Sequence, residues 1–236
     1  MDSAELNARS LLAHVLGVEE WQLGVYRKKI SEQQANQLGG LIQKRSQRIP
    51  LQHLVGSVGF YGLDVQVSPS ALIPRPETEL LVETVIKTIH SQQKQNEPVK
   101  LLDMATGTGC IALALAKELP MAQVWGLDIS EAALNLARNN ASNSGLEKRV
   151  TWIHSDMFSG IKDPGQQWDY IISNPPYIPS HEIGELEPEV RDHDPKLALD
   201  GGQDGLDIYR ILAHQAGRWT TQRGFIFLEC GKDQAQ

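Results

Sequence analysis

The sequence of 236 residues is poor in cysteine, in long apolar runs and in secretion signals. Its two cysteines give neither a disulfide framework nor the spacing of a metal site, so we expect no metal and a reducing, cytoplasmic environment. No apolar run approaches the ~20 residues of a membrane-spanning helix. Asp2 and Glu5 interrupt any basic and then apolar leader pattern at the N-terminus. These absences predict a soluble protein without a membrane partner.

Basic charge is also scarce. The formal net charge is −7, and it is unevenly distributed: residues 1–95 carry 10 Lys and Arg against 9 Asp and Glu, whereas residues 96–236 carry 12 against 20. Domains that bind duplex DNA usually have a basic face, because contacts to phosphates supply much of the affinity. We therefore expect no direct binding to DNA by the acidic C-terminal part.

Residues 1–50 have the pattern of a small helical domain. Apolar residues suit one face of a first helix that ends near Gly17. Ser31 followed by Gln34 resembles a capping box, which predicts the start of a second helix. Between residues 51 and 73, glycines alternate with valines and a phenylalanine, which favours a β-hairpin linker.

Residues 74–236 alternate apolar strand patterns with helical ones, which predicts an α/β domain. The expected fold is a doubly wound, mostly parallel, Rossmann-like sheet. The acidic connection 178–207 is too long to be an idle loop in a compact domain. The expected strands are 99–104, 124–129, 150–154, 170–173 and 225–229.

A loop rich in small residues, 103–109, follows the first of these strands. Small residues let the backbone approach a ligand closely, and the following helix offers free N–H groups at its N-terminus. Asp128, at the end of the second strand, suits a carboxylate that binds a ribose diol. Taken alone, these features fit a nicotinamide-dependent dehydrogenase as well as a methyltransferase.

Other acidic residues favour a methyltransferase. Asp103, at the end of the first strand, suits a cationic amino-acid moiety better than a pyrophosphate. After the third strand, Asp156 and Met157 combine an acid with a soft apolar side chain where an adenine could lie. The predicted cofactor is therefore S-adenosylmethionine. The candidate cofactor-binding residues are Asp103, Ala105, Thr106, Gly107, Thr108, Gly109, Asp128, Asp156, Met157 and Asn174.

The fourth strand ends at Asn174-Pro175-Pro176-Tyr177. Because proline has no N–H, the carbonyl groups of this loop are free to face a ligand rather than a sheet partner. The Asn174 oxygen and the Pro175 carbonyl can together accept both hydrogens of a primary amide or an exocyclic amine. The Tyr177 ring supplies a flat surface for that group. All four loops leave the carboxyl ends of strands, where open α/β sheets bind ligands.

Together these motifs resemble the amino class of S-adenosylmethionine-dependent methyltransferases, which includes adenine N6 and protein glutamine N5 enzymes. The segments 60–62, 72–79 and 199–206 are similar to those of the peptide chain release factor glutamine N5-methyltransferases, and this resemblance covers essentially the whole chain.

That resemblance implies a release factor as the protein substrate, whose glutamine belongs to a Gly-Gly-Gln loop. It implies a substrate-recognition domain at 1–50, a hairpin linker at 51–73 and a methyltransferase domain at 74–236, and we expect a monomer. The implied catalytic residues are Asn174, Pro175 and Tyr177. The implied substrate-binding residues are Asn174, Pro175, Pro176, Tyr177, Phe60, Arg75 and Glu77.

The sequence departs from the family pattern in two places. Ala105 stands where the family usually has its first glycine, so we expect a more crowded cofactor loop. The last helix and strands of the family's domain are lacking, so the expected sheet is C-terminally truncated. Two alternatives stay open at this point: an adenine N6-methyltransferase acting on nucleic acid, and a non-catalytic fragment that binds the cofactor or a release factor.

Overall fold

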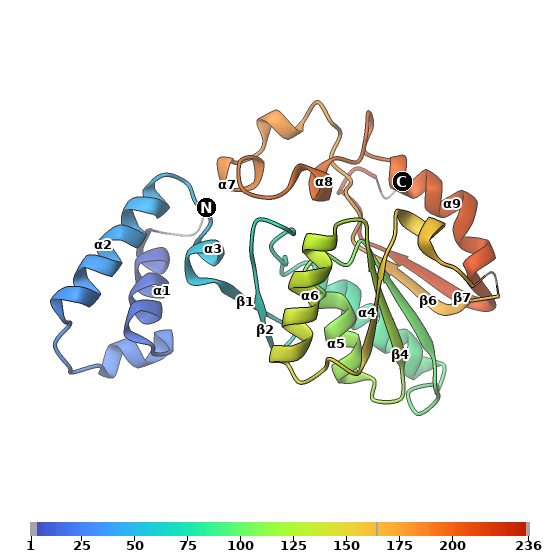
Figure 1. The fold of residues 1–236 in the computed structure, drawn as a ribbon, viewed down its shortest axis with the longest axis horizontal. Coiled ribbons are helices and arrows are strands. Elements are labelled where there is room, and N and C mark those ends of the chain that lie inside the picture. The colour runs from blue at the N-terminus through green and yellow to red at the C-terminus, as the bar shows by residue number, and fades with distance from the viewer. Residues whose placement is uncertain (1–3, 164, 235–236) are drawn as a thin grey trace.

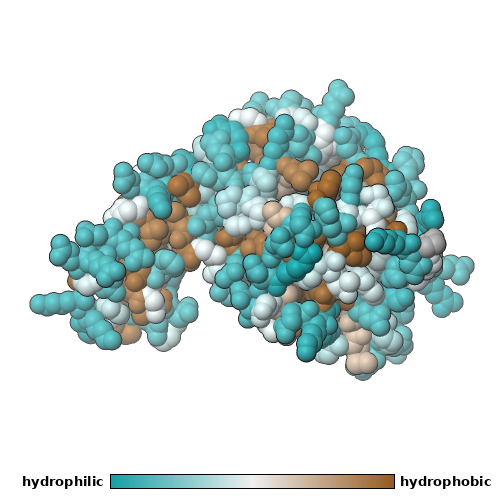
Figure 2. Space-filling view, in the orientation of Figure 1, coloured by the Kyte–Doolittle hydropathy of each residue, from teal (hydrophilic) through white to brown (hydrophobic). Residues whose placement is uncertain are grey.

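The computed structural model describes residues 4–163 and 165–234. They form a helical lobe, a short hairpin and a parallel sheet covered by helices on both faces (Figure 1). Figure 2 shows the helical lobe as a separate protrusion, joined to the larger body at one side. Within the described residues, no helix is long and apolar enough to cross a membrane.

The lobe begins with α1, which ends where Gly17 turns the chain with a φ of +63°. The second long helix starts at the predicted capping box: the Gln34 N–H donates to the Ser31 hydroxyl, and the Gln34 side chain accepts from the Ser31 N–H. The elements of the lobe are α1 (Ala4–Leu16), the 3-10 helix η1 (Glu20–Val25) and α2 (Glu32–Ser46).

The hairpin is shorter than the predicted 51–73, because the first residues of that range form the helix α3 (Leu51–Val55). Strands β1 (Ser57–Phe60) and β2 (Leu63–Gln66) pair antiparallel. Asn140 fixes the hairpin to the larger domain. Its Oδ1 accepts from the Gln66 N–H at 2.8 Å, and its Nδ2 donates to the carbonyl of Thr108 at 2.9 Å. One buried amide therefore ties the hairpin to the glycine-containing loop.

The sheet has the order β5-β4-β3-β6-β7, and every pair is parallel. The chain starts in the middle at β3, runs out to β5, and then crosses to the other side through β6. This change of direction lies between β3 and β6, and such points are where doubly wound sheets bind ligands. The strands are β3 (Lys100–Met104), β4 (Gln123–Asp128), β5 (Val150–His154), β6 (Trp168–Ser173) and β7 (Thr220–Leu228).

Successive side chains of β3 enter opposite cores. Leu101 packs with residues of α4 and α5, and Leu102 packs with residues of α9. The sheet is therefore sandwiched, as the predicted Rossmann-like fold requires (Figure 1). The covering helices are α4 (Thr78–Ser91), α5 (Cys110–Glu118), α6 (Glu131–Asn143) and α9 (Asp207–Trp219).

The long connection 178–207 forms a structured bridge between the lobe and the sheet. Arg45 pairs with Glu189 at 2.9 Å, and Arg48 pairs with Glu187 and Glu189 at 2.5 and 2.6 Å. These contacts hold the connection against the end of α2. The short elements within this connection are η3 (Ile183–Glu185), α7 (Pro188–Arg191) and α8 (Lys196–Leu199), and η2 (Met157–Gly160) follows β5.

Candidate functional site

A cleft of about 220 Å³ opens at the carboxyl ends of β3, β4, β5 and β6. It brings together side chains from all four loops that the sequence singles out, and from the connection 178–207. Because parallel strands end at the same edge of a sheet, residues far apart in sequence meet there. The cleft-lining residues used below are Ala105, Thr106, Gly107, Thr108, Asp128, Ile129, Asp156, Met157, Asn174, Pro176 and Leu197.

Asp128 is held rigidly at the edge of this cleft. One of its carboxylate oxygens accepts from the Gly107 N–H at 2.8 Å, and the other accepts from the Ser130 N–H at 2.9 Å. Burial raises the pKa of Asp128, and these backbone donors oppose that shift. Each oxygen keeps a further lone pair for a ligand hydroxyl. Asp128 is therefore a preorganised acceptor.

The loop between β3 and α5 uses left-handed backbone at three positions. Ala105 and Gly107 have a φ of +55°, and Gly109 has a φ of +81°. A Cβ atom at position 109 would lie 2.9 Å from the ring of Trp152 and 3.0 Å from Ala137. Gly109 thus permits close packing behind the loop. Gly109 is not among the residues that line the cleft, so its predicted cofactor contact stays a prediction.

We predict that Ala105→Gly raises the free energy of unfolding by up to about 1 kcal/mol. A left-handed conformation costs an L-residue ~1–2 kcal/mol, and glycine's extra freedom in the unfolded chain offsets only part of that gain. Gly107→Ala is the matched control, because it has the same φ and an added Cβ would meet only the Ala71 Cβ, at 3.7 Å. Urea denaturation should show changes of opposite sign, and a less stable Ala105→Gly variant would contradict the prediction.

Asp103 does not face the cleft, which corrects its predicted contact with a cationic cofactor group. The residue is 0% exposed, and its Oδ2 accepts from the Thr106 hydroxyl and from the Ala112 N–H. Burial raises the pKa of Asp103 to about 7. Its role is to fasten the loop to the start of α5. Its Oδ1 has no hydrogen-bond partner among the described residues.

The rest of the cleft fits S-adenosylmethionine. Ile129 and Leu197 are large apolar side chains left 44% and 57% exposed at its walls, and Met157 also lines it. A flat adenine would cover such apolar surface. The exposed Asp156 and the fixed Asp128 then remain for polar groups of the nucleoside. No group of side chains in the described parts of the chain could hold a metal ion.

A second hollow adjoins the cleft, and Asn174 lines both. Pro175 and Tyr177 line the second hollow, whereas Pro176 lines the cleft. The Asn174 Nδ2 donates to the Thr78 hydroxyl at 3.1 Å, so its Oδ1 is left as the acceptor. No hydrogen bond among the described residues engages the Pro175 carbonyl. Neither predicted acceptor oxygen is therefore engaged by a hydrogen bond from the described residues.

The segment 199–206 supports Tyr177 from behind. A Cβ at Gly201 would lie 2.8 Å from the Cα of Tyr177, and one at Gly205 would lie 2.3 Å from the Tyr177 carbonyl oxygen. Ile178 also donates to the carbonyl of Leu199 at 3.0 Å. The glycines of this segment therefore let two loops pack backbone to backbone.

Three predicted substrate-binding residues have different outcomes. Arg75 lines both the cleft and the second hollow, and it pairs with the buried Asp194 at 2.6 Å. Phe60 is 1% exposed inside the core under the hairpin, which corrects its predicted place in the site wall. Glu77 is exposed at the start of α4 and lines neither hollow; the pKa of Tyr177 is raised mainly by burial, and the charges of Glu229 and Glu77 add to that rise.

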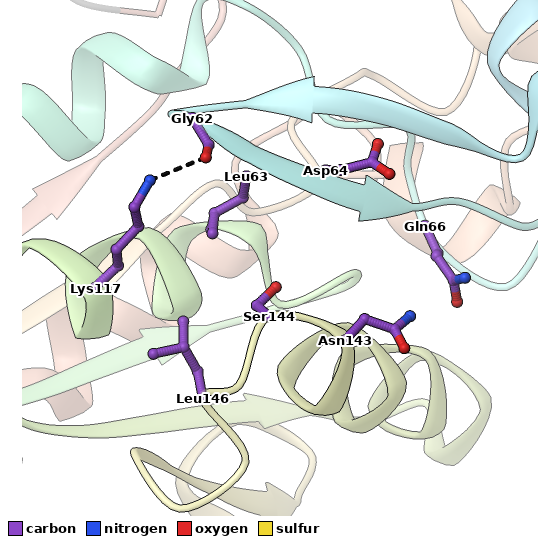
Figure 3. A pocket seen from close by; sticks show the side chains of 8 residues that line it. All are labelled: Gly62, Leu63, Asp64, Gln66, Lys117, Asn143, Ser144 and Leu146. Carbon is purple, nitrogen blue, oxygen red and sulfur yellow. Dashed lines mark hydrogen bonds between the residues drawn. The ribbon is translucent and has the colours of Figure 1, made fainter. Parts of the chain in front are cut away.

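A third hollow lies under the hairpin, between Leu63, Lys117 and Leu146 (Figure 3). Its volume of about 490 Å³ exceeds that of the cleft. However, Lys117 already donates to the Gly62 carbonyl at 2.9 Å, and the neighbouring polar groups do not converge on one point (Figure 3). The cleft, with its fixed acceptors, is the better functional candidate.

Thr78 belongs to the segment 72–79 that the sequence singles out, but sequence reasoning missed two residues that act beside it. Thr78 and Glu229 lie beside Asn174, and Asp194 fixes Arg75. No local motif marks Glu229 or Asp194, because their roles depend on contacts across the sheet. Leu197 also escaped notice, although the unusual length of 178–207 pointed to its segment.

Comparisons with known proteins identify the family to which the chain is similar. Residues 76–188 match the family model "Methyltransferase small domain", and residues 1–56 match "PrmC N-terminal domain". The chain is 40% identical over its full length to the release factor glutamine methyltransferase of Geobacter sulfurreducens, covering 80% of that protein. It is 38% identical to that of Thermodesulfovibrio yellowstonii over 97% of the chain and 80% of the relative.

A solved structure supports the fold. The catalytic domain of hMettl16, in complex with MAT2A 3′UTR hairpin 6, superposes with a TM-score of 0.52. The match covers 67% of this chain and 58% of that one at 15% identity. At this identity the likeness establishes the methyltransferase fold alone.

Proposed function

The chain belongs to the release factor glutamine methyltransferase family, and we propose that it methylates the side-chain amide nitrogen of a release factor's Gly-Gly-Gln glutamine. S-adenosylmethionine is the methyl donor. The observation that carries this proposal is the position of Asn174, at the junction between a nucleoside-sized cleft and a second hollow.

The chain's own groups hold the cofactor. When bound, S-adenosylmethionine supplies an electrophilic methyl group on a sulfonium. Asp128 would accept from the ribose hydroxyls, and the Gly107 loop would let the backbone approach the ligand. Ile129, Met157 and Leu197 would enclose the adenine and exclude water.

The Asn174 loop orients the glutamine amide that receives the methyl group. An amide nitrogen is a poor nucleophile because its lone pair is delocalised into the carbonyl. The two N–H groups of the substrate amide donate to the Asn174 Oδ1 and to the Pro175 carbonyl. These hydrogen bonds orient the nitrogen and favour positive charge on it. Tyr177 would pack on the amide plane. Burial raises the pKa of Tyr177, so its hydroxyl stays neutral at pH 7.

The remaining assignments concern partners. Residues 1–50 would recognise the release factor, and 74–236 would carry the chemistry, with 51–73 between them. The acidic charge of the catalytic part favours a protein substrate over DNA. We propose that the enzyme acts as a monomer, in the cytoplasm where release factors work.

A transfer assay with three acceptors tests the proposal. The chain should move a labelled methyl group from S-adenosylmethionine to a purified bacterial release factor. It should not label adenine-containing DNA or RNA, nor a release factor whose Gly-Gly-Gln glutamine is replaced by asparagine. Label on the nucleic acid would favour the adenine-methylating alternative. Cofactor binding without transfer to any acceptor would mean a non-catalytic binding fragment.

A further inference from the structure

Three polar side chains, those of Thr78, Asn174 and Glu229, meet behind the cleft. Thr78 comes from the first turn of α4, Asn174 directly follows β6, and Glu229 directly follows β7. Ser173 pairs with Leu228 in the parallel ladder between these strands, so Asn174 and Glu229 are the next neighbours along it. Neighbouring strands lie ~4.8 Å apart, which brings these two side chains within reach of each other.

The backbone of Glu229 is fixed on both sides. Its N–H donates to the Ser173 carbonyl at 3.0 Å, and its carbonyl accepts from the Tyr209 hydroxyl at 2.7 Å. The Glu229 carboxylate is therefore attached to a backbone with a fixed position beside the Asn174 loop. It lines neither the cleft nor the second hollow, so it is not placed to touch the cofactor or the substrate.

The Asn174 amide has two possible orientations, and only one serves the reaction. A primary amide can rotate by half a turn with little change of shape, exchanging an acceptor for a donor. If NH₂ faced the cleft, it would repel the substrate N–H groups. If Oδ1 faces the cleft, NH₂ must point backward, where it donates to the Thr78 hydroxyl at 3.1 Å. A hydroxyl alone cannot select this orientation, because it both donates and accepts.

We propose that Glu229 is the positioning residue that selects the productive orientation of the Asn174 amide. An ionised carboxylate only accepts hydrogen bonds, so it attracts the NH₂ group and repels Oδ1. Thr78 assists by accepting from Asn174 at 3.1 Å, which leaves its own hydroxyl proton free to point towards the Glu229 carboxylate. This inference rests on the proposed function, since it concerns how the site receives an amide.

The electrostatics of Glu229 agree with this role. Burial raises the pKa of Glu229, and hydrogen bonding from Thr78 and Asn174 opposes that rise. Its Oε2 is buried with no hydrogen-bond partner in the described residues. A half-buried carboxylate with one unpartnered oxygen costs folding free energy. Removing it should therefore harm activity without harming stability, whereas a structural residue would lose both together.

Glu229→Met and Glu229→Gln provide the test. Methionine matches the length of glutamate without polar atoms, so kcat for release-factor methylation should fall about 10-fold or more, as for loss of a hydrogen bond to a charged group. Glutamine can offer either an acceptor or a donor, so its kcat should lie between those of Glu229→Met and the wild type. For both variants, KM and the affinity for the cofactor should equal the wild-type values. The melting temperature should equal or exceed that of the wild type. Glu118→Met, on the exposed side of α5, is the control that should leave every value unchanged.

A double variant separates positioning from other roles. Glu229→Met added to Asn174→Ala should cause no further loss of kcat, because the group to be oriented is gone. Wild-type kcat in Glu229→Met, a parallel loss of kcat and melting temperature, or losses that multiply in the double variant would each overturn the proposal. If the wild type itself transferred no methyl group to a release factor, the proposed function would fail instead.

Discussion

Asn174→Ala should reduce kcat for methylation of the release factor by about 100-fold or more. The variant removes one of two preorganised acceptors at the nitrogen where positive charge develops, and deleting one such contact typically costs that much. The free energy of unfolding should fall by only about 1 kcal/mol, because the side chain makes a hydrogen bond to Thr78 but belongs to neither core. Initial-rate methylation assays measure the change in kcat, and urea denaturation measures the change in the free energy of unfolding.

Asn174→Asp makes the same test sharper. Aspartate keeps the shape and an acceptor oxygen in the place of Oδ1, but it cannot donate to the Thr78 hydroxyl as the Asn174 Nδ2 does. It would also place a second carboxylate beside Glu229. We therefore expect activity as low as in Asn174→Ala. Near wild-type activity in either variant, with label still on the glutamine, would refute the role of this side chain.

The second large effect is expected at the cofactor. Asp128→Ala should weaken S-adenosylmethionine binding by about 1–3 kcal/mol, which is roughly 5- to 150-fold in affinity, as for a lost hydrogen bond to a charged group. The alanine also leaves the N–H groups of Gly107 and Ser130 without their acceptor. Part of the loss could therefore come from a disordered loop rather than from the missing ribose contact.

A cofactor analogue separates these two causes. Calorimetry with S-adenosylmethionine and with a form lacking a ribose hydroxyl should show discrimination in the wild type and much less in Asp128→Ala. Asp128→Asn is the milder variant, because it keeps one acceptor for the backbone. Unchanged affinity for the intact cofactor in Asp128→Ala would contradict the assignment, and equal discrimination in both proteins would place the ribose elsewhere.

The sequence predicts the frame of the site well, because local patterns determine where strands end. Parallel strands with loops at Gly107, Asp128, Met157 and Asn174 must present those loops at one edge, and all four line the cleft. The capping box at Ser31 was equally local and is confirmed. Fold class follows from such repeated short-range signals.

What the sequence could not predict is the direction in which each side chain points. Asp103 lies one residue before the end of β3 and Phe60 ends β1, yet each side chain turns into the interior. Asp103 does so because its partners, the Thr106 hydroxyl and the Ala112 N–H, come from the following loop and helix. Contacts such as that between Glu229 and Asn174 depend on the pairing of strands separated in sequence, and no periodicity reports them.

The most direct test is to locate the transferred methyl group. A release factor incubated with the chain and methyl-labelled S-adenosylmethionine should be digested, and its peptides fragmented by mass spectrometry. We predict a single added methyl group on the side-chain amide nitrogen of the Gly-Gly-Gln glutamine, at an amount that falls about 100-fold in initial rate with Asn174→Ala. A methyl group on another residue, or none on the release factor, would contradict the proposed role of the chain.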